Sequence, residues 1–420
     1  MRILLVGSGG REHALAWRLS HEAEVLATPG NPGIAEDVET ANILSTNFEG
    51  ILKLAKSFSA DFVMFGPEDP LIQGGADYLR ENQMPVFGPD RAAARLEGSK
   101  AYAKDLMRSA KIPTAQFETF HDPMLAKTYA RTRAADGYQV VVKASGNALG
   151  KGVVVCDDIR QAEDAIDMMM VQGAFGVAGK EIVIEDRLDG REFSLFTLVS
   201  DRYMVSLPVA RDYKRVGDSD NGPNTGGMGT YSPDTSVSST LIEEVENQIV
   251  KPSLAALHRD GLHFRGVLFT GIMMHHGRPH CLEFNVRFGD PETQSLMMRC
   301  EGGLADALFA CAKGEPIAAP QFSDQAAVTV VLASQGYPGE YVKGLPVRIG
   351  TLPEGIKVFH AGTAMQDGRL VTHGGRVLNV SATGPTLAET RAKVYQAIHH
   401  VTFEGAFCRS DIAAEATPTN

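Results

Sequence analysis

Apolar and polar side chains alternate in the first half of the stretch LEFNVRFGDPETQ, which covers residues 282–294. A period of two is typical of a half-buried β-strand, because successive side chains of a strand point to opposite faces. Glu283, Asn285 and Arg287 are therefore predicted to share one face. The apolar residues, from Leu282 to Phe288, are predicted to pack behind them. A carboxylate, an amide and a guanidinium on one face make this strand a candidate functional element.

The first hundred residues combine short apolar runs with helical spacing. The runs at 2–6, 61–70 and 84–90 predict three strands, and residues 11–19 predict the helix after the first of them. Strands that alternate with helices are typical of a parallel sheet, in which ligands bind at the carboxyl ends of the strands. The turn GSGG and the loop GPEDP lie at such ends.

Further patterns predict elements along the rest of the chain. The predicted helices cover residues 98–110, 160–170, 238–260 (broken near Pro252) and 385–400. The predicted strands cover residues 138–145, 153–156, 181–188, 192–200 and 202–210, a hairpin at 265–288, and short strands at 326–334, 344–350 and 357–363. Residues 211–233 show no regular period and predict a long functional or flexible loop. The change of pattern after Pro316 predicts a separate C-terminal domain of mixed β and α structure.

Composition narrows the class of protein. The chain has 420 residues, 44% of them hydrophobic, a net charge of −11 and five scattered cysteines without a CxxC pair. The acidic balance argues against nucleic-acid binding, and the cysteines indicate neither a disulfide framework nor a zinc site. No apolar run reaches the roughly 18 residues that a membrane span needs. We expect a cytoplasmic protein without membrane or nucleic-acid partners.

The polar face of residues 283–287 suits a divalent cation and a phosphoryl group. Carboxylate and amide oxygens two residues apart are ligands that Mg²⁺ or Mn²⁺ accepts, and a guanidinium next to them can hold an anion. A solvated outer strand face is the alternative. Asp290 and Glu292 in the following Gly/Pro turn favour a site, because they add charge at the same strand end.

The segment VVVKASGNALGKGV is a candidate phosphate-binding element. Lys143 ends an apolar strand, and a glycine-rich loop follows it from Gly146 to Gly152. Exposed backbone N–H groups and Lys151 suit phosphate oxygens. The loop is not a Walker A motif, because Gly152 stands where Ser or Thr would follow the lysine. A plain glycine turn is the alternative.

The N-terminal turn GSGGREHA fails the dinucleotide fingerprint. Gly7 and Gly9 are present, but Glu12 stands in place of the third glycine. Backbone N–H groups at the start of the following helix still suit a phosphate. A sugar phosphate is therefore favoured here over NAD.

Five motifs together resemble one family of enzymes. They are GSGGREHALAW, GPEDPL, LEGSKAYAKDLM, DYKRVGDSDNGPNTGGMGTYSP and RFGDPETQ. The chain resembles the phosphoribosylamine–glycine ligases, also called glycinamide ribonucleotide synthetases, which are ATP-grasp enzymes of purine biosynthesis. The resemblance implies an α/β multidomain fold with an N-terminal parallel-sheet (pre-ATP-grasp) domain, a two-lobed ATP-grasp domain and a barrel-sandwich-like C-terminal domain. We place these at residues 1–103, 104–325 (small lobe about 120–190) and 326–420.

The same resemblance implies the reaction and the roles of residues. Glycine and 5-phosphoribosylamine are joined with ATP cleavage by way of glycyl phosphate, with Mg²⁺ or Mn²⁺ as the metal. The implied metal ligands are Glu283 and Asn285. The implied ATP-binding residues are Lys100, Lys143, Gly146, Gly150, Lys151, Gly152, Glu185, Leu188 and Glu192. The implied catalytic residues are Arg287, Asp290, Asp212, Lys214 and Arg215. The implied substrate-binding residues are Gly9, Gly10, Glu68, Asn224 and Gly226.

The chain departs from the family pattern at the nucleotide-binding positions. Ser145 stands where the family commonly has an acid, and Glu185 is followed by Asp186 and Arg187 instead of a second Glu and an aromatic residue. The alternatives are another ATP-grasp ligase or carboxylase, which the N-terminal and 211–233 motifs argue against, and a non-catalytic nucleotide-binding regulator. The presence of Lys143, Glu283 and Asn285 argues against the regulator. The sequence leaves the oligomeric state open, with a monomer as one possibility.

Overall fold

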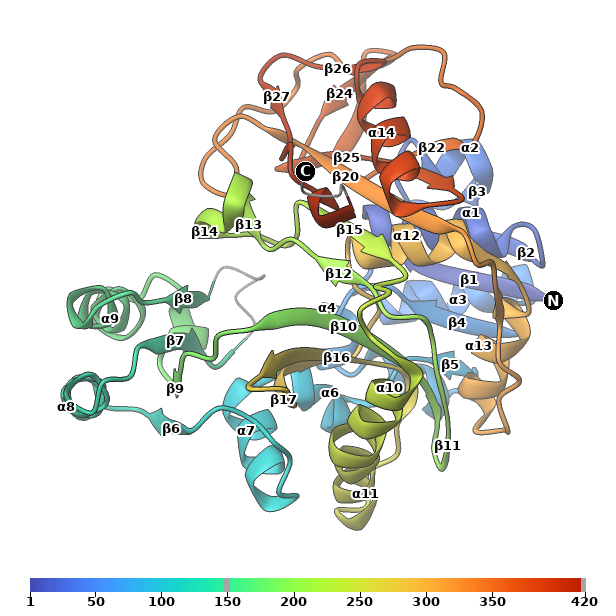
Figure 1. The fold of residues 1–420 in the computed structure, drawn as a ribbon. Coiled ribbons are helices and arrows are strands. Elements are labelled where there is room, and N and C mark those ends of the chain that lie inside the picture. Colours follow the sequence, from blue (N-terminus) through green and yellow to red (C-terminus); the bar gives the residue numbers. More distant parts are fainter. Residues whose placement is uncertain (147–151, 417–420) are drawn as a thin grey trace.

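The computed structural model of the chain describes residues 1–146 and 152–416 (Figure 1). Its N-terminal part is a five-stranded parallel sheet in the order β3-β2-β1-β4-β5. The strands are β1 (Arg2–Gly7), β2 (Glu24–Pro29), β3 (Glu39–Thr40), β4 (Phe62–Phe65) and β5 (Val86–Phe87). The helices are α1 (Gly10–Leu19), α2 (Ile34–Asp37), α3 (Phe48–Phe58), α4 (Asp69–Ile72) and α5 (Gly75–Glu81). The three predicted strands are confirmed, whereas β2 and β3 were missed.

The helix predicted at 98–110 is confirmed as α7 (Lys100–Ser109). A separate helix, α6 (Arg91–Gly98), ends just before it and was missed. The boundary is Ser99, which has an extended backbone and accepts a hydrogen bond from the Tyr102 N–H through its side chain. A side-chain oxygen in this position satisfies a free N–H of the first helical turn, so α7 begins with Lys100.

A small lobe follows, which extends to the left of the rest of the molecule in Figure 1. Its sheet is antiparallel in the order β6-β9-β7-β8. The elements are β6 (Phe117–Phe120), α8 (Pro123–Ala135), β7 (Val140–Ala144), β8 (Val153–Val155), α9 (Ile159–Ile166) and β9 (Ile182–Asp186), with a π-helical turn at Asp167–Val171 and a 3-10 turn at Gly176–Gly179. The lobe has a hydrophobic core of its own. β6 and α8 were missed by the sequence prediction.

The central sheet has the order β11-β10-β16-β17 and is antiparallel. Its strands are β10 (Arg191–Ser200), β11 (Tyr203–Ser206), β16 (Arg265–His275) and β17 (Arg278–Asn285). The accompanying helices are α10 (Ser239–Val245), α11 (Lys251–Arg259), α12 (Glu292–Arg299) and α13 (Leu304–Lys313). A π-helical turn at Glu246–Val250 joins α10 to α11, so the predicted irregularity lies just before Pro252.

A bulge in β17 corrects one detail of the alternation pattern. Gly271 pairs with Glu283 and Ile272 pairs with Cys281, which leaves Leu282 as the extra residue. Phe284, Val286 and Phe288 are buried as predicted. Leu282 does not join them, because the bulge turns it toward the cavity described below.

The C-terminal sheet includes strands from the middle of the chain. Its order is β12-β15-β20-β25-β22, with β27 paired to β20. The strands are β12 (Arg211–Asp212), β15 (Gly229–Ser232), β20 (Ala326–Ser334), β22 (Ile356–His360), β25 (Arg376–Gly384) and β27 (Ala406–Phe407). The prediction of an irregular loop at 211–233 is therefore wrong, because this segment supplies two sheet strands and the hairpin β13 (Arg215–Gly217) and β14 (Asn221–Asn224). The C-terminal sheet therefore includes Asp212, the first residue of the sequence motif DYKR.

Smaller elements complete the fold. They are β18 (Cys300–Gly302) with β19 (Gln321–Phe322), β21 (Arg348–Ile349) with β26 (Val401–Thr402), β23 (Thr363–Gln366) with β24 (Arg369–Thr372), helix α14 (Leu387–Ile398), and 3-10 turns at Asp218–Asp220 and Ala414–Ala416. One continuous hydrophobic core packs the N-terminal sheet against the central sheet. Within residues 1–146 and 152–416, no helix is long and apolar enough to cross a membrane.

Candidate active site

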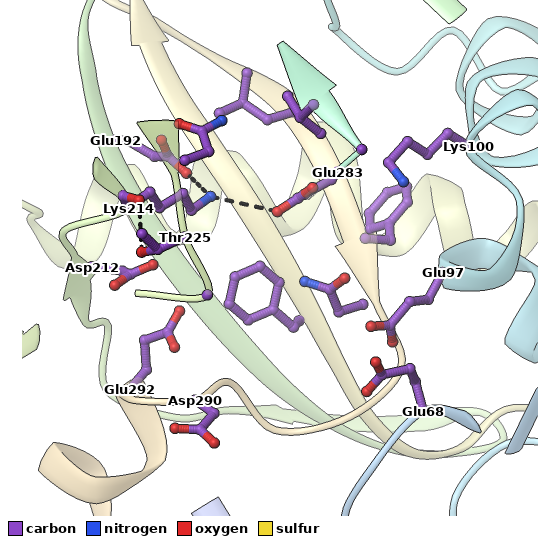
Figure 2. A pocket seen from close by; sticks show the side chains of 18 of the residues that line it. Glu68, Glu97, Lys100, Glu192, Asp212, Lys214, Thr225, Glu283, Asp290 and Glu292 are labelled. Atoms are coloured by element: carbon purple, nitrogen blue, oxygen red, sulfur yellow. Dashed lines mark hydrogen bonds and ion pairs between the residues drawn. The ribbon is translucent and has the colours of Figure 1, made fainter. Parts of the chain in front are cut away.

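A cavity of about 890 Å³ lies where the N-terminal sheet, the small lobe, the central sheet and the 211–227 segment meet. Most of the predicted site residues line it, although they come from distant parts of the chain (Figure 2). The lining predicted residues are Gly9, Glu68, Lys100, Lys143, Gly152, Glu185, Leu188, Glu192, Asp212, Lys214, Arg215, Asn224, Gly226, Glu283, Asn285, Arg287 and Asp290. Gly150 and Lys151 lie outside the described residues. Gly10 and Gly146 do not line the cavity.

Glu283 is held beside a lysine on the floor of the cavity. The Lys214 Nζ atom lies 3.4 Å from Glu283 Oε1 and is also paired with Glu192 (Figure 2). Burial opposes ionisation of Glu283, but the charges of Lys214, Lys143, Lys100 and Arg287 together outweigh it and lower the Glu283 pKa to about 2. Glu283 is therefore an ionised oxygen donor at neutral pH.

Two carboxylates fix the guanidinium of Arg287. Its Nη2 lies 2.9 Å from Glu97 Oε1, and its Nε lies 3.3 Å from Glu68 Oε2. Glu97 also accepts a hydrogen bond from the Val286 N–H at 2.8 Å, and the Asn285 amide, with its oxygen and nitrogen exchanged, donates to Glu97 Oε1 at 3.2 Å. Burial raises the Glu97 pKa to about 7, against the effect of Arg287. Glu97 thus connects the backbone and two side chains of the 283–287 strand end.

A buried trio of charges joins the small lobe to α7. Glu185 on β9 is paired with both Lys104 on α7 and Lys143 on β7. All three side chains are less than a tenth exposed. The Glu185 pKa is lowered, because the two lysines outweigh the effect of burial. Glu185 therefore fixes the position of the two cations that face the cavity.

Ser145 explains how the chain accommodates a departure from the family pattern. Its carbonyl oxygen accepts from the Lys100 N–H at 2.8 Å, and its hydroxyl accepts from the Ala101 N–H at 3.1 Å. The serine thereby satisfies N–H groups in the first turn of α7 and ties that turn to the end of β7. Lys100 is positioned at the cavity by this contact.

Two further carboxyl groups lie together on the opposite wall. Asp212 and Glu292 face the same part of the cavity (Figure 2). Burial raises the pKa of both, and the charge of Glu292 raises the Asp212 pKa further. The Asp212 Oδ1 atom is buried and makes no hydrogen bond to any described residue. Ser194 donates to Glu292 Oε1 at 3.2 Å.

The Asp290 pKa is shifted in the opposite direction from those of this pair. Its Oδ1 accepts from Gln294 Nε2 at 2.9 Å, and its Oδ2 lies 3.4 Å from Arg376 Nη2. Burial opposes ionisation, but Arg376 and Arg11 outweigh it and lower the Asp290 pKa. Asp290 is therefore ionised at neutral pH and bound to a cation of the C-terminal domain.

The N-terminal turn differs from a free phosphate-binding turn. The Gly9 N–H donates to Glu12 Oε2 at 2.6 Å, so that N–H group is already bonded. Glu12 Oε1 in turn accepts from Arg11 Nε at 2.5 Å. A Cβ on Gly10 would meet the side chains of Gln294 and Asn379, so Gly10 serves close packing of α1. The Gly146 N–H is also bonded, to the Ala178 carbonyl at 3.2 Å.

A second cavity of about 400 Å³ adjoins the first. It lies between the N-terminal turn and the C-terminal domain, and Asn31, Tyr337, Thr363 and His373 are among its lining residues. Four residues line both cavities: Ser8, Gly9, Asp290 and Arg376. A ligand in the smaller cavity would therefore contact the wall of the larger one.

Sequence reasoning assigned no role to several residues of the site. They are Arg11, Glu12, Glu97, Lys104 and Arg376. All lie near glycine-rich or charged motifs, but their partners are distant in sequence. Glu97 and Val286, for example, are 189 positions apart. Only the fold brings such pairs together.

The fold and this charged cavity define an ATP-grasp enzyme, and comparisons with known proteins agree. Family models for the N domain, the ATP-grasp (A) domain and the C domain of phosphoribosylglycinamide synthetase match residues 1–97, 98–293 and 327–415. A phosphoribosylamine–glycine ligase of Rhizobium meliloti (strain 1021) is 46% identical, over 99% of each chain. The chain belongs to the phosphoribosylamine–glycine ligase family. It is thus an ATP-dependent ligase that joins glycine to phosphoribosylamine, which is a step of purine biosynthesis.

Solved structures give the same result at the level of the fold. The crystal structure of a phosphoribosylamine–glycine ligase from Thermotoga maritima superposes with a TM-score of 0.86 at 36% identity, covering 98% of this chain and all of that one. A biotin carboxylase domain of the Hydrogenobacter thermophilus 2-oxoglutarate carboxylase has a TM-score of 0.72 at 18% identity, covering 97% of this chain and 91% of that one. The second likeness concerns the fold alone.

Proposed function

We propose that the large cavity makes glycyl phosphate from ATP and glycine, and that the amine of 5-phosphoribosylamine then captures it. The observation that carries this proposal is the ionised Glu283 beside Asn285 and Arg287, facing Lys100, Lys143 and Lys214. Phosphoryl transfer depends mainly on positioning and on neutralising charge, and this arrangement supplies both.

Glu283 and Asn285 would hold a divalent cation. The donor set fits Mg²⁺ or Mn²⁺, because Glu283 is ionised and Mg²⁺ usually takes one or two carboxylates together with water and phosphate oxygens. The biotin carboxylase domain structure named above is a complex with MgADP. When bound, the cation would neutralise charge on the ATP phosphates. Lys100 and Lys143 would contact phosphate oxygens from the other side.

Arg287 would hold the transferred phosphoryl group. Glu68 and Glu97 fix its guanidinium, so its direction is set before substrate binds. The carboxylate oxygen of glycine attacks the γ-phosphorus, and ADP leaves. Asp212, Lys214 and Arg215 would hold glycine, with Asn224 and Gly226 beside it. The buried, unbonded Asp212 Oδ1 suits the glycine ammonium group.

The acceptor amine would come from the smaller cavity. A ribose phosphate placed there would lie against Gly9 and Asp290, which line both cavities. Its amine nitrogen then bonds to the glycyl carbonyl carbon, the carbon–oxygen bond to phosphate breaks, and the amine loses a proton. Glu68, which precedes α4, lines the large cavity and would meet the amine there. Gly10 would contribute through close packing of α1 rather than by direct contact.

The segment from Glu185 to Glu192 would hold the nucleotide base and ribose. Leu188 and Glu192 line the cavity between the small lobe and the central sheet, and Gly152 lines it just before β8. Gly146 would bind ATP as part of the glycine-rich loop. Gly150 and Lys151 would also bind ATP, and they lie outside the described residues. We further propose a cytoplasmic, monomeric enzyme with domain boundaries near residues 103 and 325.

Labelled glycine tests the chemical route. If the glycine carboxylate is the nucleophile, heavy oxygen placed in that carboxylate must appear in the released phosphate. We expect one labelled oxygen per phosphate and no phosphoprotein, because no Ser, Cys or His was found in a recognisable nucleophile motif of the sequence. Unlabelled phosphate after full turnover would exclude the acyl-phosphate route while leaving the overall reaction intact.

A further inference from the structure

One guanidinium of the C-terminal domain reaches the wall between the two cavities. Arg376 is the first residue of β25, and its Nη1 donates to the Gly226 and Asp290 carbonyl oxygens, each at 2.6 Å. A longer contact of 3.3 Å joins Nη1 to the Gly227 carbonyl. Nη2 lies 3.4 Å from the Asp290 carboxylate. A single side chain thus links the turn at 226–227 to the turn at 290.

The turn at 226–227 is shaped around this side chain. A Cβ on Gly226 would lie 3.0 Å from Arg376 Cζ. Gly227 has a φ of +111°, and a Cβ there would lie 2.7 Å from Asp212 Oδ1. Any side chain at either position would displace the guanidinium or the carboxyl group. Gly226 and Gly227 therefore let the C-terminal domain contact the part of the large cavity in which the substrate glycine is proposed to bind.

A second residue of the C-terminal domain holds the same turn. The Tyr337 hydroxyl accepts from the Gly226 N–H at 3.1 Å. Both the N–H and the carbonyl of Gly226 are therefore bonded to the C-terminal domain. This domain supplies neither Glu283 nor any cavity lysine, yet it fixes the partition between the two cavities.

We propose that Arg376 is a positioning residue for the transfer of the glycyl group to the amine, and that it acts by holding the 226–227 turn and Asp290 at the junction of the cavities. This inference rests on the route proposed above, in which the acyl phosphate forms in the large cavity and the amine arrives from the smaller one. Among the described residues, Arg376 bonds to none of the 283–287 strand end, on which phosphoryl transfer depends. It holds instead the 226–227 turn beside the substrate glycine and Asp290 at the wall of the smaller cavity. Loss of its contacts therefore affects the second half of the reaction more than the first.

Two assays separate the halves of the reaction. ATP labelled with heavy oxygen in the β,γ-bridge reports acyl-phosphate formation, because reversible cleavage in the presence of glycine lets the label move to non-bridging positions. Formation of glycinamide ribonucleotide from freshly made phosphoribosylamine reports the complete reaction. Both are measured on full-length Arg376→Gln, Arg376→Lys and Tyr337→Phe, with melting temperature and ADP binding as checks of folding.

A matched control lies in the same domain. Arg391 on α14 donates to the Ile412 and Ser410 carbonyls at 3.0 and 2.6 Å, but it lines neither cavity. Arg391→Gln removes a guanidinium that is bonded to carbonyl oxygens in a comparable way. It is expected to change neither assay beyond any general loss of folded protein.

We expect Arg376→Gln to keep glycine-dependent label movement within about threefold of the wild type and to lower product formation by about 30-fold, the scale of one or two hydrogen bonds to a charged group. ATP cleavage without product should rise in proportion. Tyr337→Phe should show the same pattern more weakly, and Arg376→Lys should lie between Arg376→Gln and the wild type.

Two results would overturn the assignment in distinguishable ways. The first result is that label moves in the wild type, while Arg376→Gln and Arg376→Lys lose label movement and product formation equally. It would overturn the role of Arg376 alone. Unlabelled phosphate from wild-type turnover of heavy-oxygen glycine would overturn the acyl-phosphate route and this proposal with it. If Arg376→Gln fails to fold, Arg376→Lys and Tyr337→Phe decide the question by the same criterion.

Discussion

The large cavity and the junction between α1 and β22 both gather ionisable side chains, but they balance charge in different ways. At the junction His13 lies between Asp37, 3.0 Å from its Nε2, and the His360 N–H, which donates to its Nδ1 at 2.7 Å. Lys357 Nζ contacts both Asp37 oxygens at 2.8 Å. Burial lowers the His13 pKa and lowers that of His360 to about 3, so both rings are neutral.

At three carboxylates of the cavity, by contrast, neighbouring charges outweigh burial. Glu283, Glu185 and Asp290 stay ionised because cations from separate elements face them. Such cations can replace a carboxylate partner by a phosphate group of the ligand. The neutral histidine rings of the junction have hydrogen-bond partners within the protein alone. The same residue types therefore serve ligand binding in one region and domain packing in the other.

The largest expected effect concerns the charge of Glu283. Glu283→Gln keeps the shape of the side chain and removes the anion, so we expect turnover to fall by about 100-fold or more, while the fold is retained. The loss should be greatest at limiting Mg²⁺. Steady-state kinetics across a metal titration measures this. Glu49→Gln, on the exposed face of α3, is the control. Near-normal activity at limiting Mg²⁺ would refute the ligand assignment.

A second prediction uses the exchange of partners in the cavity. Glu185→Gln leaves Lys104 and Lys143 buried without their carboxylate, which should lower the free energy of unfolding by about 3–5 kcal/mol. ATP phosphates can replace the lost anion, so an ATP analogue should raise the melting temperature of the variant more than that of the wild type. Glu163→Gln, which breaks a surface pair with Arg131, is the control. If the ATP analogue raises the melting temperature of Glu185→Gln and of the wild type equally, ATP phosphates do not replace the lost carboxylate.

The junction gives a third prediction, because its histidines must stay neutral. The folded protein binds protons at His360 more weakly than the unfolded chain, whose histidine pKa is near 6.5. Stability is therefore complete above pH 6.5 and is lost as pH falls toward 3. We expect a loss of about 2 kcal/mol between pH 6.5 and pH 5. Thermal unfolding across this range measures it.

His360→Gln tests the source of that slope. The variant removes the titrating ring, so its melting temperature should fall less steeply with acid than that of the wild type, whatever its absolute stability. His399→Gln changes an exposed histidine at the end of α14 and should leave the slope unchanged. Parallel slopes in all three proteins would assign the acid sensitivity to other groups.

The sequence predicts the cavity better than the junction, for a physical reason. The alternation at 283–287 and the position of Lys143 near the end of β7 can be recognised from neighbouring residues alone. Both are present in the structure. The bulge at Leu282 was missed because it depends on pairing with β16. The strands in 211–233 were missed because β15 is completed by β20, nearly a hundred positions later. No local pattern marks His13 and His360 as neighbours.

The smallest expected effect concerns motion of the small lobe. Its core is separate from that of the N-terminal and central sheets, and the Glu185 trio joins it to α7. A nucleotide that contacts Lys143 on one side and Lys100 on the other should restrict the lobe, because ligand binding adds free energy to the closed arrangement. We expect amide exchange in β7 and β8 to slow severalfold with an ATP analogue. Exchange in α2 and β22, at the junction, should not change, because the ligand adds no contact there. Equal exchange in β7 and β8 with and without the analogue would show that the lobe is already as rigid as the junction.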